Sequence, residues 1–147
     1  MIKRTWYKFK QCNAAALDTY TGERAHLYAR LKLEGLETAP VQFAVFSDHG
    51  TVQGHRLGRE TMPETLDHSV VASILTFWLS ARAAGLGVGW VSILEPKALR
   101  ASLDLPSAWG LVAYLCVGLP IEEHLDPELS QDGWQARTAA SRDVLRR

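Results

Sequence analysis

The chain has little cysteine, no net charge and no long hydrophobic run. Its two cysteines, Cys12 and Cys116, lack metal-type spacing, and Cys116 sits in an apolar run where we expect a buried, unreactive thiol. Sixteen basic and sixteen acidic residues cancel, so charge favours neither a nucleic-acid partner nor an anionic membrane. No run reaches the roughly 18 apolar residues of a membrane span, and the N-terminus lacks the apolar core of a signal peptide. We therefore expect a cytoplasmic protein.

The chain is long enough for one domain with its own core. It has 147 residues, of which 47% are hydrophobic and 22% are charged. Periodicity and turn residues predict, in order, a strand over 41–47, a helix over 67–84, a strand over 87–93, a helix over 96–105 and a strand over 110–120. This order predicts a single α/β or α+β domain over 1–147. Residues 121–147 are polar, and we expect an extended arm that frays or wraps a partner subunit.

The predicted helix 67–84 is the most apolar segment of the chain. Its apolar residues run nearly all the way round, so more than one side must be covered. We therefore place this helix at the centre of the fold, with a subunit interface as its second cover. We expect Asp67 or Ser69 to cap its start and Gly85 to end it.

The stretch GLGVGWVSIL, residues 85–94, places three glycines at alternate positions. It is not a dinucleotide fingerprint, because the spacing is G-x-G-x-G and the glycines lead from a helix into a strand. On a strand, Val88, Trp90 and Ser92 face one way and the residues between them the other. Two interpretations stay open: a turn built only for tight packing, or a strand end whose backbone amides bind a flat polar ligand.

The remaining polar candidates have ordinary explanations. His49 and His55 flank a glycine-containing loop without a third ligand in register, so we expect solvated side chains and no metal site. Glu64 and Asp67 form either an acid/base pair or, more simply, favourable charges at a helix N-terminus. Ser92 has no nucleophile elbow around it, which argues against a hydrolase.

Several stretches together resemble the nitroreductase-like flavoprotein superfamily. They are RLKLEGLETAPVQFAVF, LGRETMPET, LSARAAGLGVGWVSILEPKALRASLDLP, LVAYLCVGLP and DGWQAR, and they run from about Glu23 to Arg137. The sequence of these stretches is most similar to the flavin-consuming branch of the family, which makes dimethylbenzimidazole, the lower ligand of cobalamin. The resemblance implies an α+β three-layer sandwich that forms a homodimer with FMN at the subunit interface, and a reaction between reduced flavin and O₂.

The resemblance also implies which residues meet the flavin. The strand end would run past the flavin ring at Ser92, Ile93 and Leu94, with Ser92 assisting ring fragmentation by hydrogen bonding. The GW-x-x-R pattern assigns the FMN phosphate to Arg137, and the KLEG segment would border the site through Leu33.

Two departures from the family pattern change the expectation. The basic RRDxR-type segment that grips the phosphate and supplies a catalytic aspartate is not found, and TAASRDVLRR differs from the family's ending. We therefore expect a fold shortened at its N-terminal third, with weak FMN binding and low turnover, because each Arg–phosphate contact contributes about 1.5–3 kcal/mol. The alternatives are an NAD(P)H-dependent FMN nitroreductase and a non-catalytic dimerisation remnant.

Overall fold

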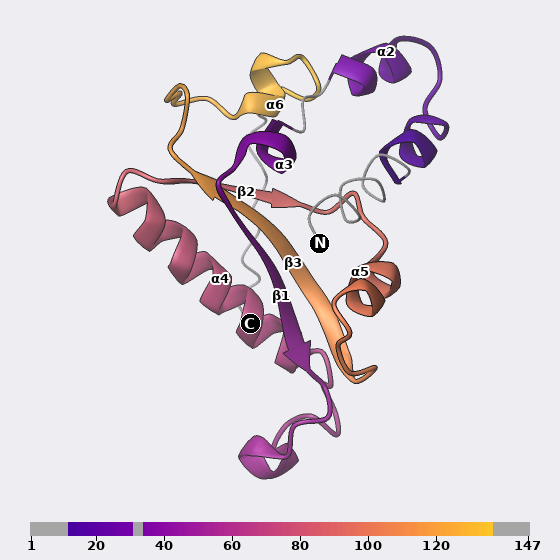
Figure 1. The fold of residues 1–147 in the computed structure, drawn as a ribbon, viewed down its shortest axis with the longest axis vertical. Helices are drawn as coiled ribbons and strands as arrows, with labels where there is room; N and C mark the ends of the chain where they lie inside the picture. Colours follow the sequence, from indigo (N-terminus) through magenta and orange to yellow (C-terminus); the bar gives the residue numbers. More distant parts are fainter. Residues whose placement is uncertain (1–11, 31–33, 137–147) are drawn as a thin grey trace, which may run out of the picture.

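The computed structural model describes residues 12–30 and 34–136 (Figure 1). Its elements are, in chain order, a helical segment over 12–17, α2 (Gly22–Arg30), α3 (Glu34–Thr38), β1 (Val41–Asp48), the 3-10 helix η1 (Gln53–Arg56), α4 (Thr65–Ala83), β2 (Gly87–Val91), α5 (Pro96–Ser102), β3 (Trp109–Gly118) and α6 (Glu128–Gln131). The predicted mixed α+β class is confirmed. In the described part of the chain, no helix is long and apolar enough to cross a membrane.

The three strands form one antiparallel sheet in the order β1-β3-β2. β3 takes the centre because it is the longest and most apolar strand, with residues 113–117 all buried. β1 and β2 are the edges, and the pairing of β1 with β3 shifts register between Val45 and Phe46. The predicted strands 41–47 and 110–120 are thereby confirmed to within two residues at each end.

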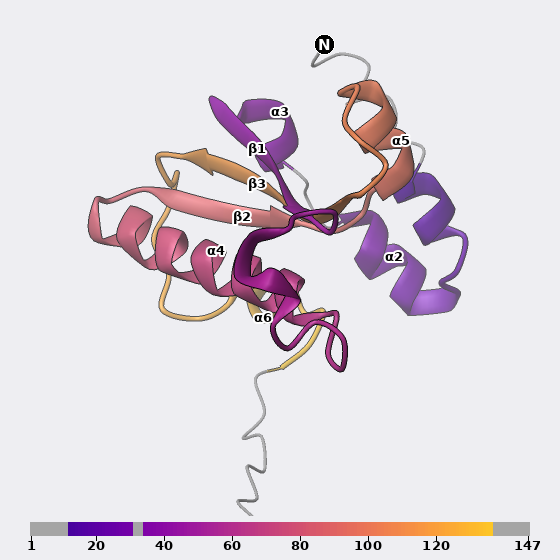
Figure 2. The same ribbon diagram turned by 90° about the horizontal axis from the view of Figure 1, so that it is seen from below.

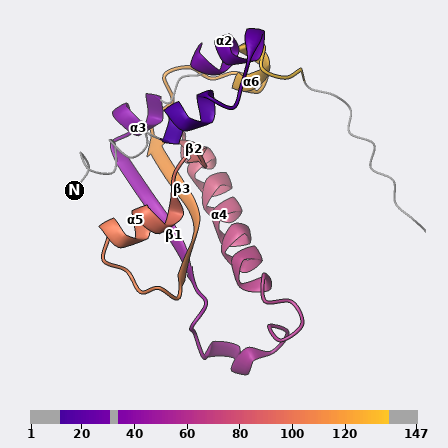
Figure 3. The same ribbon diagram turned by 90° about the vertical axis from the view of Figure 1, so that its right-hand side faces the viewer.

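Helices cover both faces of the sheet (Figures 2 and 3). Because side chains alternate between the two faces along each strand, they enter two separate hydrophobic cores. The core beneath α4 contains Ile74, Ala81, Val88, Ala113, Leu115 and Val117. The core beneath α3 and α5 contains Leu36, Leu99, Tyr114 and Cys116. Burial raises the pKa of the Cys116 thiol to about 11, as expected for a cysteine in an apolar strand.

The central helix lies where the sequence predicts it, but its start differs. α4 begins at Thr65, and the residue before it, Glu64, makes no capping hydrogen bond with its side chain. The prediction that Asp67 or Ser69 caps the helix is wrong, because both lie inside the first turns and bond elsewhere. At the other end, Gly85 adopts a φ of +75°, as expected for the glycine that ends a helix.

The segment from β2 to α5 turns earlier than predicted. β2 ends at Val91, whose partner on β3 is Tyr114, so Ser92 and Ile93, which the sequence predicts as strand, lie beyond the end of β2. A turn bond from the Leu94 amide to the Ser92 carbonyl, 3.0 Å, redirects the chain. α5 then begins at Pro96, as predicted. Its first turn is capped by the Glu95 carboxylate, which accepts from two backbone amides.

Candidate functional site

The end of β2 presents a short exposed segment between the sheet and α5. Ser92 is exposed, and within the described residues its hydroxyl makes no hydrogen bond. Leu94 packs against the core beneath α5, and Ile93 is half-buried. The predicted alternation holds along β2 itself, because Val88 enters the α4 core while Val91 packs against the other one. The segment therefore leaves the Ser92 hydroxyl exposed just beyond the end of the edge strand β2.

The two glycines of β2 are not required by the packing around them. A Cβ at Gly89 would lie 4.0 Å from its nearest neighbour, Cys116, and one at Gly87 would lie 3.6 Å from the Gly118 carbonyl oxygen. Both are ordinary contacts, and neither glycine has a positive φ. Within the described part of the chain, therefore, tight packing does not explain why β2 has no side chains at these positions.

A second polar cluster joins β1 to the start of α4. The Ser47 hydroxyl donates to the Asp67 carboxylate, and His49 Nε2 lies 2.8 Å from both Ser47 Oγ and Asp67 Oδ1. Ser47 is only 3% exposed. The imidazole ring lies over Gly110 of β3, where a Cβ would come within 2.8 Å of the His49 Cε1 atom. The cluster thus fixes the loop after β1 against both α4 and β3.

This cluster is not a hydrolase triad. In a triad, one imidazole nitrogen accepts the proton of the serine, and the other nitrogen donates a hydrogen bond to the carboxylate, which orients the ring. Here Ser47 and Asp67 both bond Nε2 of His49.

The cluster also borders a cavity of about 430 Å³ that two arginines line. Both arginines already have partners within the chain: Arg56 pairs with Glu60, and Arg59 donates to backbone carbonyls.

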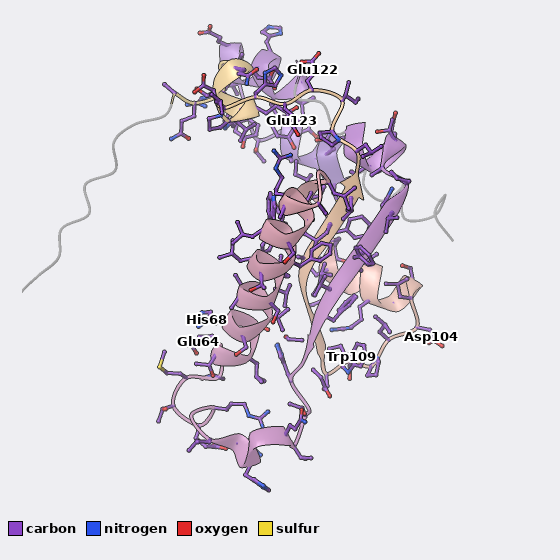
Figure 4. All side chains as sticks on the ribbon, turned by 90° about the vertical axis from the view of Figure 1, so that its left-hand side faces the viewer. Glu64, His68, Asp104, Trp109, Glu122 and Glu123 are labelled. Carbon is purple, nitrogen blue, oxygen red and sulfur yellow. The ribbon has the colours of Figure 1, made fainter. Side chains whose placement is uncertain are left out.

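Of the two interpretations of Glu64 and Asp67, the arrangement favours charges at a helix N-terminus over an acid/base pair, because Glu64 directly precedes α4 and Asp67 lies in its first turn. Glu64 and His68 lie beside each other on the outer side of the first turn of α4 (Figure 4), whereas Asp67 bonds Ser47 and His49. Burial raises the pKa of the Asp67 carboxyl, but the hydrogen bonds from Ser47 and His49 lower it by more, so its pKa lies below the usual value. Asp67 is therefore a structural anion.

Asp67 should make stability depend on acid pH. Because its pKa is lowered on folding, the stability it contributes is present above the unfolded pKa and is lost as pH falls through the folded pKa. Asp67→Asn should cost about 1 kcal/mol near pH 7, a low value for a half-exposed charged partner, and almost nothing at pH 2. Urea unfolding at several pH values measures this. Glu64→Gln is the control, and a cost for Asp67→Asn that is the same at all pH values would contradict the prediction.

The predicted flavin residues are only partly placed. Ser92, Ile93 and Leu94 lie together at the end of β2, whereas Leu33 and Arg137 lie outside the described residues. Among the described residues, no group of three His, Cys, Asp or Glu side chains is arranged to hold a metal ion. The sequence interpretation missed Ser47, since a lone serine at the end of an apolar strand carries no signal until Asp67 is brought beside it.

Comparisons with known proteins agree on one family. The model described as Nitroreductase family matches residues 3–119. The chain is 60% identical over 129 residues to the 5,6-dimethylbenzimidazole synthase of Rhodospirillum rubrum, covering 88% of this chain and 61% of that protein. It is 47% identical over 127 residues to the enzyme of the same name from Rhodobacter capsulatus, covering 86% of this chain and 61% of that protein. The chain thus spans about three fifths of these curated relatives.

A solved structure has a similar fold. The nitroreductase family protein of Clostridium difficile superposes with a TM-score of 0.50 at 21% identity, covering 74% of this chain and 62% of that one. At this level of identity the likeness concerns the fold alone.

Proposed function

The chain belongs to the nitroreductase family, and from that premise we propose that it is an oxidoreductase of the dimethylbenzimidazole synthase type. Family membership implies a flavin. The proposal is that this flavin is FMN, and that reduced FMN and O₂ are converted to 5,6-dimethylbenzimidazole for cobalamin biosynthesis. We also propose that the helix–sheet–helix arrangement is the three-layer sandwich of the family.

The observation that carries the proposal is the bare backbone of β2 beside an exposed serine. Gly87 and Gly89 have room for a methyl group, so a glycine strand here suits the close approach of something other than the chain's described residues. Ser92 follows on the same strand end with a free hydroxyl among those residues. A flat ring with polar edges, such as a flavin, fits a bare strand that ends in a hydrogen-bonding group.

The residues at this strand end would have separate tasks. Ser92 would hydrogen-bond a heteroatom of the flavin ring, while Ile93 and Leu94 would border it. Leu33 would contact the ring from the KLEG segment, and Arg137 would bind the phosphate, since a guanidinium suits phosphate oxygens. When bound, reduced FMN supplies the ring carbons of the product and the electrons for O₂.

Product analysis tests the function directly. The purified chain is incubated with FMN and a chemical reductant in air, and dimethylbenzimidazole is sought by mass spectrometry against a heat-denatured control. Product above that control supports the proposal. Oxidation of added NADPH with the flavin left intact would instead show a nitroreductase. A stable dimer that binds no flavin and forms no product would show a non-catalytic module.

Substituting Gly89 should separate flavin binding from folding. Gly89→Ala should leave stability unchanged or raise it by up to about 1 kcal/mol, because the site has room and alanine reduces unfolded-state entropy. It should nevertheless weaken FMN binding by about tenfold, or 1.4 kcal/mol, since the methyl group would occupy the space beneath the ring. Quenching of flavin fluorescence measures the affinity.

Gly110→Ala is the matched contrast. There the added methyl meets the His49 ring at 2.8 Å, so the melting temperature should fall. Unchanged FMN affinity in Gly89→Ala would show that the flavin does not approach β2 at this point.

We propose that the partner is a second copy of the chain, docked on α4. Val71, Leu75 and Leu79 recur every fourth residue on one side of this helix and are exposed in the single chain, Leu75 by 57% and Leu79 by 64%. The neighbouring hydroxyls are satisfied within the helix, each donating to the carbonyl four residues earlier: Ser69, Ser73, Thr76 and Ser80. A subunit that covers this face therefore buries apolar area without leaving any of these hydroxyls without a hydrogen-bond partner.

A further inference from the structure

The serine of the proposed site lies in the short connection between β2, which ends at Val91, and α5, which begins at Pro96 (Figure 1). On the β2 side, Val91 is fixed by its pairing with Tyr114 of β3. On the α5 side, Leu94 packs against the core beneath α5, and its amide donates to the Ser92 carbonyl oxygen at 3.0 Å. The backbone of Ser92 is therefore held between two fixed points, and the second of them depends on α5.

α5 is too short to be stable by itself. It has seven residues, whereas an isolated helix in water is marginal below about 12–15 residues. Contacts outside the helix must therefore hold it in place. At its N-terminal half these are the Leu99 side chain, which is only 5% exposed, and the cap of the first turn. Leu99 belongs to the same core as Leu94, so a change that loosens the first turn loosens the support of Leu94 as well.

Glu95 forms this cap with both oxygens of its carboxylate. Its backbone is extended, with φ −98° and ψ 108°, and its side chain lies over the first turn. Oε1 accepts from the Lys97 amide at 3.0 Å, and Oε2 accepts from the Ala98 amide. These amides stand at helix positions that have no carbonyl partner one turn earlier. Pro96 has no amide hydrogen, and the Leu99 amide bonds the Glu95 carbonyl oxygen at 3.1 Å. One carboxylate thus supplies the acceptors that the first turn lacks.

We infer that Glu95 is a positioning residue for Ser92 within the proposed function, on which this inference rests. Glu95 acts through the backbone, because amides engage both oxygens of its carboxylate. Without the carboxylate, the first turn of α5 opens, Leu94 loses part of its support, and the Ser92 hydroxyl loses its fixed place beside the flavin ring. A displacement of about 1 Å at a reacting group costs about a hundredfold in rate, so a partial loosening should cost about tenfold.

Single-turnover formation of dimethylbenzimidazole at saturating FMN tests this role. Glu95→Ala should lower the rate about tenfold and change the FMN Kd by less than about twofold, because a misplaced hydroxyl affects the reacting geometry more than the binding. Glu95→Asp and Glu95→Asn should keep the parental rate, since both side chains cap a helix well, one with a charge and one without. When Ser92→Ala is already present, adding Glu95→Ala should have no further effect on the rate.

Ala101→Gly is the matched control for stability. Ala101 is exposed near the other end of α5, and a glycine there weakens the helix about as much as the loss of a cap does. Both variants should therefore melt about 3 °C below the parent, but only Glu95→Ala should lose rate. An equal loss of rate in the two variants would show that Glu95 serves only the stability of α5, and would overturn the positioning role.

Hydrogen exchange at the Leu94 amide, measured by NMR, gives a readout that does not depend on the reaction. Because this amide donates to the Ser92 carbonyl, it should exchange about tenfold faster in Glu95→Ala than in the parent or in Ala101→Gly. Unchanged exchange would overturn the positioning role, whether or not product forms.

The rates also separate this inference from the proposed function. If Ser92→Ala slows the reaction but Glu95→Ala does not, the positioning role is overturned and the proposed function stands. If Ser92→Ala keeps the parental rate, or if the parent forms no product, the proposed role of Ser92 fails and the positioning role fails with it. Faster exchange at Leu94 would then show only that Glu95 stabilises the turn.

Discussion

Replacing Ser92 with alanine should lower the rate of dimethylbenzimidazole formation by at least about a hundredfold. Ser92 is exposed at the end of β2, and within the described residues no group competes for its hydroxyl. Its hydrogen bond would therefore be free to form with the flavin as charge develops in the ring. Because the side chain supports no packing, stability should change by less than about 0.5 kcal/mol. Single-turnover product formation and urea unfolding give the two values.

Ser107→Ala is the control for this substitution. Ser107 is also an exposed serine in a connecting segment, but it lies between α5 and β3, away from the strand end. Its variant should keep the parental rate. FMN affinity in Ser92→Ala should fall far less than the rate, because one neutral hydrogen bond contributes about 1 kcal/mol to binding. A parental rate in Ser92→Ala would exclude the serine from the chemistry.

Two glutamates on the outer face of α4 should convert the proposed dimer into a monomer. In Leu75→Glu/Leu79→Glu, charged side chains would have to enter an apolar interface. We therefore expect the dissociation constant of the dimer to rise at least about a thousandfold, or 4 kcal/mol. The folded monomer should be unharmed, because both leucines are exposed in the single chain. Light scattering after size exclusion gives the mass. If FMN binds between subunits, the monomer should also lose the flavin.

Leu57→Glu provides the control for charge alone. Leu57 is 91% exposed on the loop after η1, away from the face of α4 that carries Leu75 and Leu79, and its variant should remain dimeric. A double variant that is still dimeric would place the interface on another face. A parent chain that is monomeric at micromolar concentration would contradict the proposed partner.

The sequence predicts those parts of the fold that depend on local pattern. The strands at β1 and β3 follow from short apolar runs, α4 from an apolar segment too long for a strand, and α5 from Pro96. The sequence pattern extends this strand two residues too far, because Ser92 and Ile93 continue its alternation. Only the pairing with β3, which stops at Val91, shows where the strand ends.

The polar cluster at Ser47 and the aromatic cluster around Trp134 join residues that are far apart in the sequence, and local pattern does not reveal them. Ser47 and Asp67 are 20 residues apart, and Arg24 is 110 residues from Trp134. The polar composition of residues 121–147 predicts an arm that frays or wraps a partner, and it gives no sign of the contact between Arg24 of α2 and Trp134. No residue of these clusters forms a recognisable motif in its own segment, and only the tertiary structure shows that the residues contact each other.

The ring of His49 over Gly110 has a consequence for how this chain can evolve. Any side chain at 110 would enter the space of the imidazole at 2.8 Å, so a larger residue there is tolerated only after position 49 changes to something smaller or turns away. Loss of His49 in turn would strip Asp67 of one hydrogen bond. Positions 49, 67 and 110 should therefore vary together among relatives, and substitutions should be accepted in a definite order: 49 before 110.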